Sequence, residues 1–497
     1  IDQGYGPYDV GEVTNEFVRR AGGRCNPEII RKFVANSGEM FDHLQSLVTW
    51  PDERIHIMPT TERNPDVSPY DPSQVICQVS GATADGPVEY PMMCGGNGSY
   101  AAVAQFMGEI SHDNSIPGCA AMSRLDEIMQ FAILKGQELG AEWHYGERAL
   151  KLTTDESGAV TGAISQKLDD ESYVQYNAKT GVILCLGDYS GDNKMVWNLN
   201  ADISEFNARQ GLTQDDLFSP FADCTGDGQK MACWVGGVME PTPRASMNTG
   251  GGGGGPWGTC PYLFLNANGE RFCNEANAVG ITEATLLQPA GTVCTVTDAN
   301  YYETLKNAGL DHGAPNYGRP VYYEELVADM EAIELENPEG GAVRCCTIAE
   351  RNPSTVYASE TLEGALKLAG YEGDALQTAL DQVAKYNELC ATGKDSQYGK
   401  DGKYMVPVDT PPFYAAPSSN SKTTSAGLVT LAGVETNNNL QVIDVAGNVI
   451  PGLYAAGNCL GERYGNSYAT PFAGNSIGMA MTHGRVAGKI ITGQEVF

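Results

Sequence analysis

The stretch that decides the fold lies near the end of the chain and reads Ile450-Pro451-Gly452-Leu453-Tyr454-Ala455-Ala456-Gly457-Asn458, followed by Ala473-Gly474-Asn475-Ser476-Ile477-Gly478. An apolar run that ends in small residues predicts a short strand whose end can approach a flat ring or a phosphate chain. The second run predicts the start of a helix over 474–491. The first N–H groups of a helix favour negative charge. The two runs therefore predict a ligand site at a strand end and a helix N-terminus.

Three other segments support a cofactor-binding fold. Val182-Ile183-Leu184-Cys185-Leu186-Gly187-Asp188 lies in a continuous apolar run, which predicts a strand buried on both faces over 181–186. Thr225-Gly226-Asp227-Gly228 precedes a segment that contains Met231-Ala232, and Asn268-Gly269-Glu270-Arg271-Phe272-Cys273-Asn274-Glu275 comes later in the chain.

These four segments, in this order, resemble the signatures of the fumarate reductase and 3-ketosteroid dehydrogenase superfamily of flavoproteins. The resemblance implies FAD as the cofactor. It also implies an α/β fold, with an FAD-binding Rossmann-like domain and an inserted α+β capping domain. The residues that it places against FAD are Gly187, Asp188, Asp227, Ala456, Gly457, Asn458, Gly474, Asn475, Ser476 and Ile477.

The organisation of the chain agrees with two domains, because 497 residues exceed what one core usually supports. The segment 241–417 is dense in Pro, Gly, Asn and Tyr and contains the glycine run 250–255. We expect it to form the cap, with the FAD-binding domain built from 1–240 and 418–497. The family's Gly-x-Gly-x-x-Gly fingerprint is not found before residue 180, and we expect it upstream of Ile1.

Periodicity gives a coarse secondary structure. The expected helices are 26–50, 123–140, 321–333, 359–392 and 474–491. The expected strands are 142–145, 440–445 and 453–455, and a hairpin pairs 149–153 with 160–166.

The chain departs from fumarate reductase where that enzyme binds its dicarboxylate. The family's proton-donating Arg falls at about Val279, and its substrate-binding Arg falls at Tyr468. The family's His-Thr-x-Gly-Gly segment becomes Thr423-Thr424-Ser425-Ala426-Gly427. We therefore expect no succinate or fumarate chemistry. A Tyr in this loop is similar to 3-ketosteroid dehydrogenases, where a Tyr and a backbone N–H hold the substrate carbonyl, as in an oxyanion hole.

The candidate catalytic residues are therefore Tyr468, Arg463, Tyr464 and Tyr414. Tyr468 would polarise a carbonyl or handle a proton, and Arg463 would donate to a carbonyl or bind a carboxylate. Aromatic residues of the cap and loop could sandwich a flat, apolar substrate: Tyr262, Phe264, Phe413, Tyr414 and Phe472.

We predict an FAD-dependent oxidoreductase that acts on a CH–CH or C=C bond conjugated to a carbonyl, with hydride transfer at flavin N5, as an ene reductase or a ketosteroid-type dehydrogenase. Two alternatives remain. One is a reductase of an unsaturated carboxylate of the urocanate or acrylate kind, anchored by Arg463. The other is a non-catalytic flavin-binding subunit.

Charge and composition limit the partners. The net charge of −31 disfavours nucleic acid and anionic membranes. The 14 Cys form no Cys-x-x-Cys pair, so no metal site is expected, and no apolar run is long enough to span a membrane. Since no separate NAD motif is evident, we expect an external electron-transfer protein. A neutral unsaturated carbonyl compound is the expected substrate, and the cell envelope is preferred to the cytoplasm as the location.

Overall fold

The structure is a computed structural model. It describes residues 9–47, 57–59, 77–79, 125–217, 224–247, 255–257, 261–276, 284–285, 287–289, 291–307, 320–343, 353–420, 429–468 and 475–496. Several expectations fall on residues outside these ranges: Gly474, Val279, Phe472, the segment 423–427 and most of the glycine run, 250–254.

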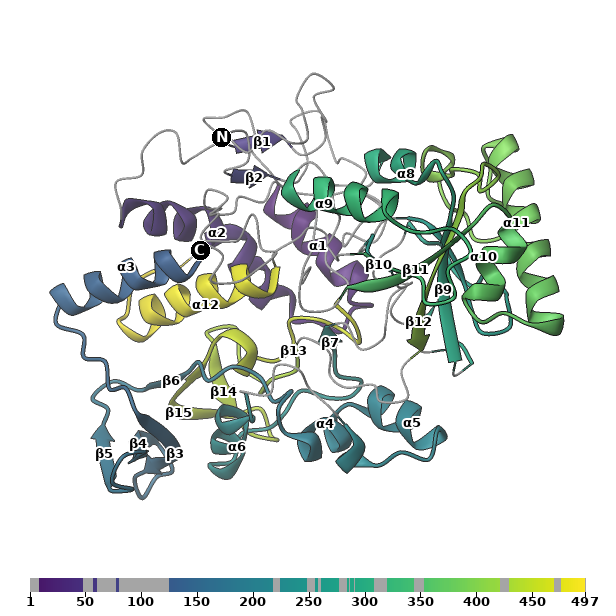
Figure 1. The fold of residues 1–497 in the computed structure, drawn as a ribbon. Coiled ribbons are helices and arrows are strands. Elements are labelled where there is room, and N and C mark those ends of the chain that lie inside the picture. Colours follow the sequence, from purple (N-terminus) through teal and green to yellow (C-terminus); the bar gives the residue numbers. More distant parts are fainter. Residues whose placement is uncertain are drawn as a thin grey trace.

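A three-stranded sheet carries the signature run of the sequence (Figure 1). Its strand order is β14-β15-β6, with β6 at Val182–Leu184, β14 at Gln441–Ile443 and β15 at Val449–Ala455. β15 and β6 are parallel, with Leu453 opposite Val182 and Ala455 opposite Leu184. The two parallel strands therefore end side by side at one edge of the sheet, as the sequence predicts for a ligand site.

A group of helices packs beside this sheet: α1 (Val10–Arg20), α2 (Pro27–Ser46) and α12 (Asn475–Ile491). α12 lies against α2 (Figure 1), and the small residues of α12 allow the close approach. A Cβ added at Gly478 would lie 3.3 Å from the ring of Phe33. The expected helices at 26–50 and 474–491 are confirmed, and α3 (Leu125–Glu138) confirms the one at 123–140.

An antiparallel meander projects from the same part of the molecule (Figure 1). It consists of β3 (Glu147–Thr154), β4 (Val160–Lys167) and β5 (Tyr173–Asn177), in that order. The expected hairpin is therefore confirmed, with its turn at 155–158. The expected strand at 142–145 is wrong, because these residues are exposed and have no strand beside them in the described chain.

The second large sheet lies on the other side of the molecule (Figure 1). All its neighbouring strands are antiparallel, in the order β10-β11-β12-β9-β8. The bounds are β8 Leu263–Leu265, β9 Gly291–Thr297, β10 Gly341–Val343, β11 Ser354–Ser359 and β12 Phe413–Asn420. The cap boundary expected at 417 falls within β12, and the domain limits stay predictions.

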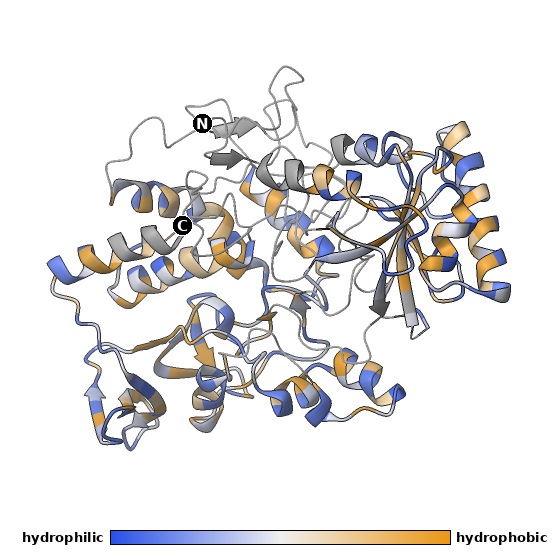
Figure 2. Cartoon of the chain, in the orientation of Figure 1, coloured by the Kyte–Doolittle hydropathy of each residue, from blue (hydrophilic) through white to orange (hydrophobic). Residues whose placement is uncertain are grey.

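Apolar residues cover both faces of this sheet. Leu263 and Leu265 pack with α10 (Leu362–Leu368) and α11 (Gly373–Thr392), whereas Phe264 packs with α9 (Pro320–Glu331) on the opposite face. This alternation follows from the two-residue period of a strand. In Figure 2 apolar and polar colours alternate around α11, as expected for a helix with one buried face. The helical segments expected at 321–333 and 359–392 are confirmed, the latter as two helices.

The remaining elements connect these layers. They are β1 (Ile57–Pro59), β2 (Cys77–Val79), α4 (Asn193–Leu199), α5 (Ala201–Arg209), η3 (Gln214–Asp216), α6 (Asp227–Trp234), β7 (Ser246–Met247), α8 (Tyr301–Asn307), η4 (Gly402–Tyr404), β13 (Val429–Thr430) and η5 (Gly457–Cys459). Among the described helices, none is long and apolar enough to cross a membrane.

Candidate functional site

The carboxyl ends of β6 and β15 meet at the centre of the candidate site. The backbone N–H of Ala456, just after β15, donates to the carbonyl of Leu184 at 3.0 Å. The side-chain amide of Gln229 in α6 donates to the carbonyl oxygens of Gly187 (3.1 Å) and Asn458 (3.0 Å). Since Gln229 is buried, this bond pair fixes the two strand ends relative to each other. No local sequence pattern indicates this role of Gln229, because its two acceptors lie far away along the chain.

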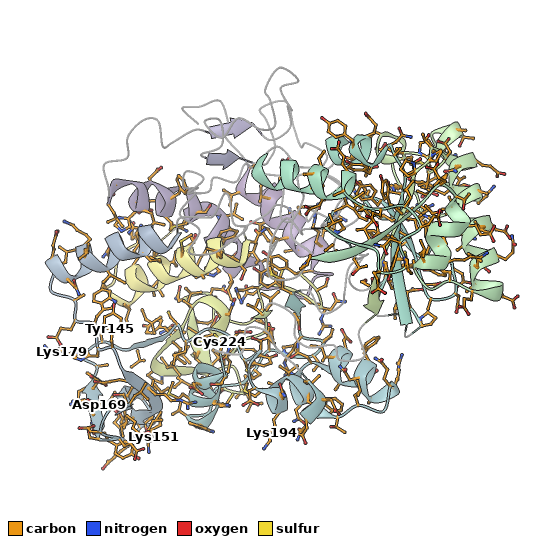
Figure 3. All side chains as sticks on the ribbon, in the orientation of Figure 1. Tyr145, Lys151, Asp169, Lys179, Lys194 and Cys224 are labelled. Carbon is orange, nitrogen blue, oxygen red and sulfur yellow. The ribbon has the colours of Figure 1, made fainter. Side chains whose placement is uncertain are left out.

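Two glycines make the backbone compact at this edge. Gly187 has a φ of +81°, and a Cβ there would lie 2.7 Å from the sulfur of Cys224. Gly457 has a φ of +62° and begins η5. In Figure 3 the Cys224 side chain lies in the interior of the drawn molecule, whereas Lys151 and Asp169 mark the outlying meander. Side chains other than hydrogen would disturb the turn that follows β6.

Two carboxylates expected against FAD have partners within the protein. The buried Asp188 accepts bonds at one oxygen, Oδ2, from the backbone N–H of Ser190 and from both the N–H and the hydroxyl of Thr430. Asp227, at the start of α6, forms a bidentate ion pair with Arg148 of β3 at 3.1–3.3 Å. These bonds shape the loops around the site, and direct contacts of the two residues with FAD stay predictions.

The loop 458–468 carries most of the candidate catalytic residues, and Arg463 is its anchor. The Arg463 side chain is 1% exposed. Its Nε donates to the carbonyl of Leu460 (2.8 Å), and Nη2 donates to the carbonyl of Leu431 (3.1 Å) and to Oδ1 of Asn458 (2.9 Å). Nη1 is buried and has no hydrogen-bond partner among the described residues. Arg463 therefore holds the loop against β13 and β15.

Tyr464 and Tyr468 lie together beyond this anchor. Their ring centroids are 5.2 Å apart, and the guanidinium of Arg463 lies 5.1 Å from the Tyr464 ring centroid. Burial raises the pKa of Tyr464 to about 12, so this hydroxyl stays protonated near neutral pH. The Tyr468 hydroxyl accepts the backbone N–H of Ser476, in the first turn of α12, at 3.1 Å. The structure thus brings Arg463, Tyr464, Tyr468 and Ser476 together.

A close approach to the N-terminal helices fixes this loop. A Cβ at Gly465 would lie 2.3 Å from the carbonyl oxygen of Ala21, at the end of α1. The backbone N–H of Asn26 donates to the carbonyl of Glu462 at 2.7 Å. The two tyrosine rings belong to the same apolar cluster as Phe17 and Phe33, so α1 and α2 support the loop from behind.

The structure also places an acid beneath this loop that sequence reasoning missed. Glu240 is buried, and its Oε2 accepts the backbone N–H of Glu462. Burial raises the pKa of Glu240 to about 8. The only available signal in the sequence was an acidic residue after the apolar pair Val238-Met239.

Tyr414 lies apart from these residues. It is in β12, where its ring meets Tyr301 edge-on at 6.0 Å, and it belongs to the apolar cluster that covers one face of the cap sheet. Tyr262 and Phe264 belong to the same cluster, and Phe413 packs on the opposite face. A substrate role for Tyr414 stays a prediction.

Two further buried polar residues, Glu275 and His483, are held by partners within the fold. The Glu275 carboxylate forms a buried ion pair with Arg271 at 2.7 Å, and Arg271 also pairs with Asp395. The buried His483 donates from Nε2 to the carbonyl of Ile29 at 3.0 Å. Burial lowers the pKa of His483 to about 4, so its ring is neutral near pH 7.

Parallel strands that end side by side in glycine turns are typical of α/β proteins that bind a nucleotide cofactor at the carboxyl ends of their strands. A family model described as "FAD binding domain" matches residues 5–477. The chain belongs to this family, and its cofactor is FAD.

Named relatives agree with this assignment. Vinyl phenol reductase from Lactiplantibacillus plantarum is 25% identical over 372 residues, which cover 71% of this chain and 69% of that protein. A crystal structure of 3-ketosteroid-Δ4-(5α)-dehydrogenase from Rhodococcus jostii RHA1 superposes with a TM-score of 0.65 at 20% identity, covering 98% of this chain and 85% of the other. The structure of a flavocytochrome c3 fumarate reductase superposes with a TM-score of 0.57 at 18% identity. The match covers 99% of this chain and 68% of the other.

The chain spans only part of several other curated relatives, between 29% and 58% of the length of three of them. The expected superfamily, the fold class and FAD as cofactor are confirmed. The expectation of an FAD-dependent oxidoreductase is confirmed at the level of enzyme class.

The residues present fit FAD. Gly187 and Gly457, both with positive φ, allow the tight turns that follow β6 and β15 at the edge where the two strands end. The N-terminus of α12 provides N–H groups for an anionic part of the cofactor. Asn458, whose Oδ1 is already engaged by Arg463, has its amide N–H groups for a cofactor oxygen. Gly474, also expected at the cofactor, lies outside the described residues.

Proposed function

We propose that this protein is an FAD-dependent reductase or dehydrogenase of a neutral substrate whose C=C or CH–CH bond is conjugated to a carbonyl or a phenol. The observation that carries this proposal is the hydrogen bond from Ser476 N–H to the Tyr468 hydroxyl at the start of α12. When bound, FAD would supply or accept the hydride.

Tyr468 would act on the substrate oxygen. An N–H that donates into a hydroxyl oxygen polarises the O–H and makes it a stronger hydrogen-bond donor. The positive end of α12 adds to this effect. Negative charge that develops on a carbonyl oxygen would therefore be stabilised at this point, as in an oxyanion hole.

The surroundings of the tyrosine pair favour an uncharged substrate. Arg463, the nearest candidate anchor for a carboxylate, is 1% exposed and already donates to three acceptors of the protein. The buried Tyr464 ring packs beside Tyr468, so the immediate surroundings of the Tyr468 ring are apolar. The relative with a curated name of vinyl phenol reductase acts on a molecule of this uncharged, aromatic kind.

A second candidate is a reductase of an unsaturated carboxylate. The observation that favours it is Arg463 Nη1, which is buried without a hydrogen-bond partner in the described part of the chain. A carboxylate that reached this nitrogen would gain a charge-assisted bond. Its approach would require the loop 458–468 to open, since the guanidinium is covered.

The electron donor and the location are proposals as well. An external electron-transfer protein would exchange electrons with FAD, and the net charge of −31 would favour a basic partner. The cell-envelope location stays a prediction.

The test is an anaerobic reoxidation assay. The FAD-loaded protein is reduced, and neutral enones, vinyl phenols, acrylate and fumarate are added separately while the oxidised flavin absorbance is followed. Rapid return of the band with neutral substrates, and not with fumarate, is the expected result. Reoxidation by carboxylates alone would overturn the proposal in favour of the second candidate.

A further inference from the structure

Arg463 is a buried cation that has no ionic partner among the residues that the structure describes. Its three hydrogen-bond acceptors are two backbone carbonyls and the side-chain amide of Asn458, all neutral. Within the described chain no carboxylate oxygen lies within 4.0 Å of its guanidinium, although other buried arginines such as Arg271 have such partners. A guanidinium stays charged at all relevant pH values. An isolated buried charge is costly, so this site gains free energy whenever a negative charge comes to lie nearby.

The titratable groups around Arg463 do not supply that charge at neutral pH. Glu240 is the buried acid closest to this loop, and its carboxyl is mostly protonated because burial raises its pKa to about 8. Glu462 is partly buried, and burial also raises its pKa. Tyr464 and His483 are neutral near pH 7. Arg244, which also faces Glu240, adds positive charge.

The position of Arg463 connects it with the cofactor edge of the sheet. Its Nη2 donates to Oδ1 of Asn458, in η5 just beyond β15, and so fixes which side of that amide carries the N–H groups. Tyr468, five residues after Arg463, contacts the first turn of α12. The loop that Arg463 anchors therefore connects the end of β15 with the positive N-terminal end of α12.

We propose that Arg463 is a positioning residue that, through Asn458, stabilises the negative charge which FAD acquires on reduction. Two-electron reduction with uptake of one proton leaves one negative charge on the cofactor. The electrons come from an electrode with mediators in the test below. A positive charge near the cofactor shifts the equilibrium between oxidised and reduced FAD toward the reduced form. The inference rests on the FAD site of the proposed function and is independent of the substrate.

The size of the effect follows from Coulomb's law. A unit charge ~10 Å away, in surroundings of effective dielectric constant about 20, changes an equilibrium by roughly tenfold. A tenfold change in a two-electron equilibrium corresponds to about 30 mV. Arg463→Gln is therefore expected to lower the midpoint potential of bound FAD by about this amount. Arg463→Lys keeps the charge and is expected to lower it by less than half as much.

The experiment is a spectroelectrochemical titration of the FAD-loaded wild type, R463Q, R463K and R244Q. Arg244 is the matched control, because it too donates to backbone carbonyls, those of Glu240 and Leu199. R244Q is expected to keep the wild-type potential. An unchanged potential in R463Q, or an equal fall in R463Q and R463K, would overturn the proposal.

Asn458→Asp keeps the inference testable if the Arg463 variants do not retain FAD. This change places a carboxylate against the guanidinium, which neutralises its charge without removing the side chain, and it also removes the amide N–H groups through which Arg463 is proposed to act. A lower potential is expected, and an unchanged one would overturn the proposal. No substrate is present in any of these titrations. A failure of the proposed substrate class would therefore leave the potential shift intact, and absence of bound FAD from the wild type would refute the proposed function itself.

Discussion

Replacing Glu240 with Gln should stabilise the protein in a pH-dependent way. The Glu240 carboxyl is buried and accepts the backbone N–H of Glu462, a bond that the amide oxygen of Gln can also accept. Burial raises its pKa from the ordinary 4.5 to about 8. Between these pH values the unfolded chain ionises the carboxyl, whereas the folded protein keeps it protonated.

The sign and the size of the effect follow from this difference. The stability associated with the protonated carboxyl is fully present below pH 4.5 and is lost as the pH rises to about 8. Each pH unit in this window lowers the free energy of unfolding by about 1.4 kcal/mol. At neutral pH the wild type has therefore lost on the order of 3 kcal/mol of stability. The E240Q variant has no such loss. It should therefore match the wild type at acidic pH and exceed it increasingly toward pH 8.

Urea unfolding measures this difference. Wild type, E240Q and E156Q are compared at saturating FAD, at about pH 5 and about pH 8. Glu156 is an exposed carboxylate in the turn between β3 and β4, so E156Q should show the pH dependence of the wild type. A difference between E240Q and wild type that stays constant from pH 5 to pH 8 would refute the burial argument.

Three further changes test other parts of the structure. Tyr468→Phe should slow turnover of a neutral substrate by roughly 10²–10³-fold while FAD affinity, measured by fluorescence titration, stays unchanged; equal turnover would exclude Tyr468 from the reaction. Gly465→Ala should destabilise the protein by about 1–3 kcal/mol because the new methyl group meets the carbonyl of Ala21, and an unchanged melting temperature would contradict the close approach. Arg271→Met should cost about 3–5 kcal/mol in urea unfolding, because two buried carboxylates lose their arginine partner and Lys400, at 3.4 Å from Glu275, is the cation that remains beside them; a loss below about 1 kcal/mol would show that they are solvated.

The strand and helix that frame the site could be predicted from local sequence. The run of small residues from Ala455 to Asn458 indicates a strand end, and the expected strand 453–455 lies within β15. The small residues of 474–491 indicate a closely packed helix, and α12 has that character. These signals are local, because they depend on residue size and on backbone freedom at glycines. The strand predicted at 142–145 is absent, because a strand needs a neighbouring strand to pair with, and the local sequence pattern does not reveal whether one is present.

The polar bonds that hold the site together could not be predicted. Gln229 reaches acceptors 42 and 229 residues away, and Arg463 reaches the carbonyl of Leu431, 32 residues earlier. Such partners depend on how the layers pack, and an ordinary helical Gln carries no sign of them. For the same reason the sequence suggested Arg463 as a substrate anchor, whereas the structure shows its guanidinium covered and bonded to the protein.

FAD and Tyr468 are proposed to act together on an uncharged conjugated substrate. The most direct measurement is the rate at which a neutral enone restores the oxidised flavin absorbance of the anaerobically reduced protein, in wild type and in Y468F. We expect fast reoxidation of the wild type, roughly 10²–10³-fold slower reoxidation of Y468F, and no response of either protein to fumarate. Equal rates in the two proteins, or reoxidation by fumarate alone, would contradict it.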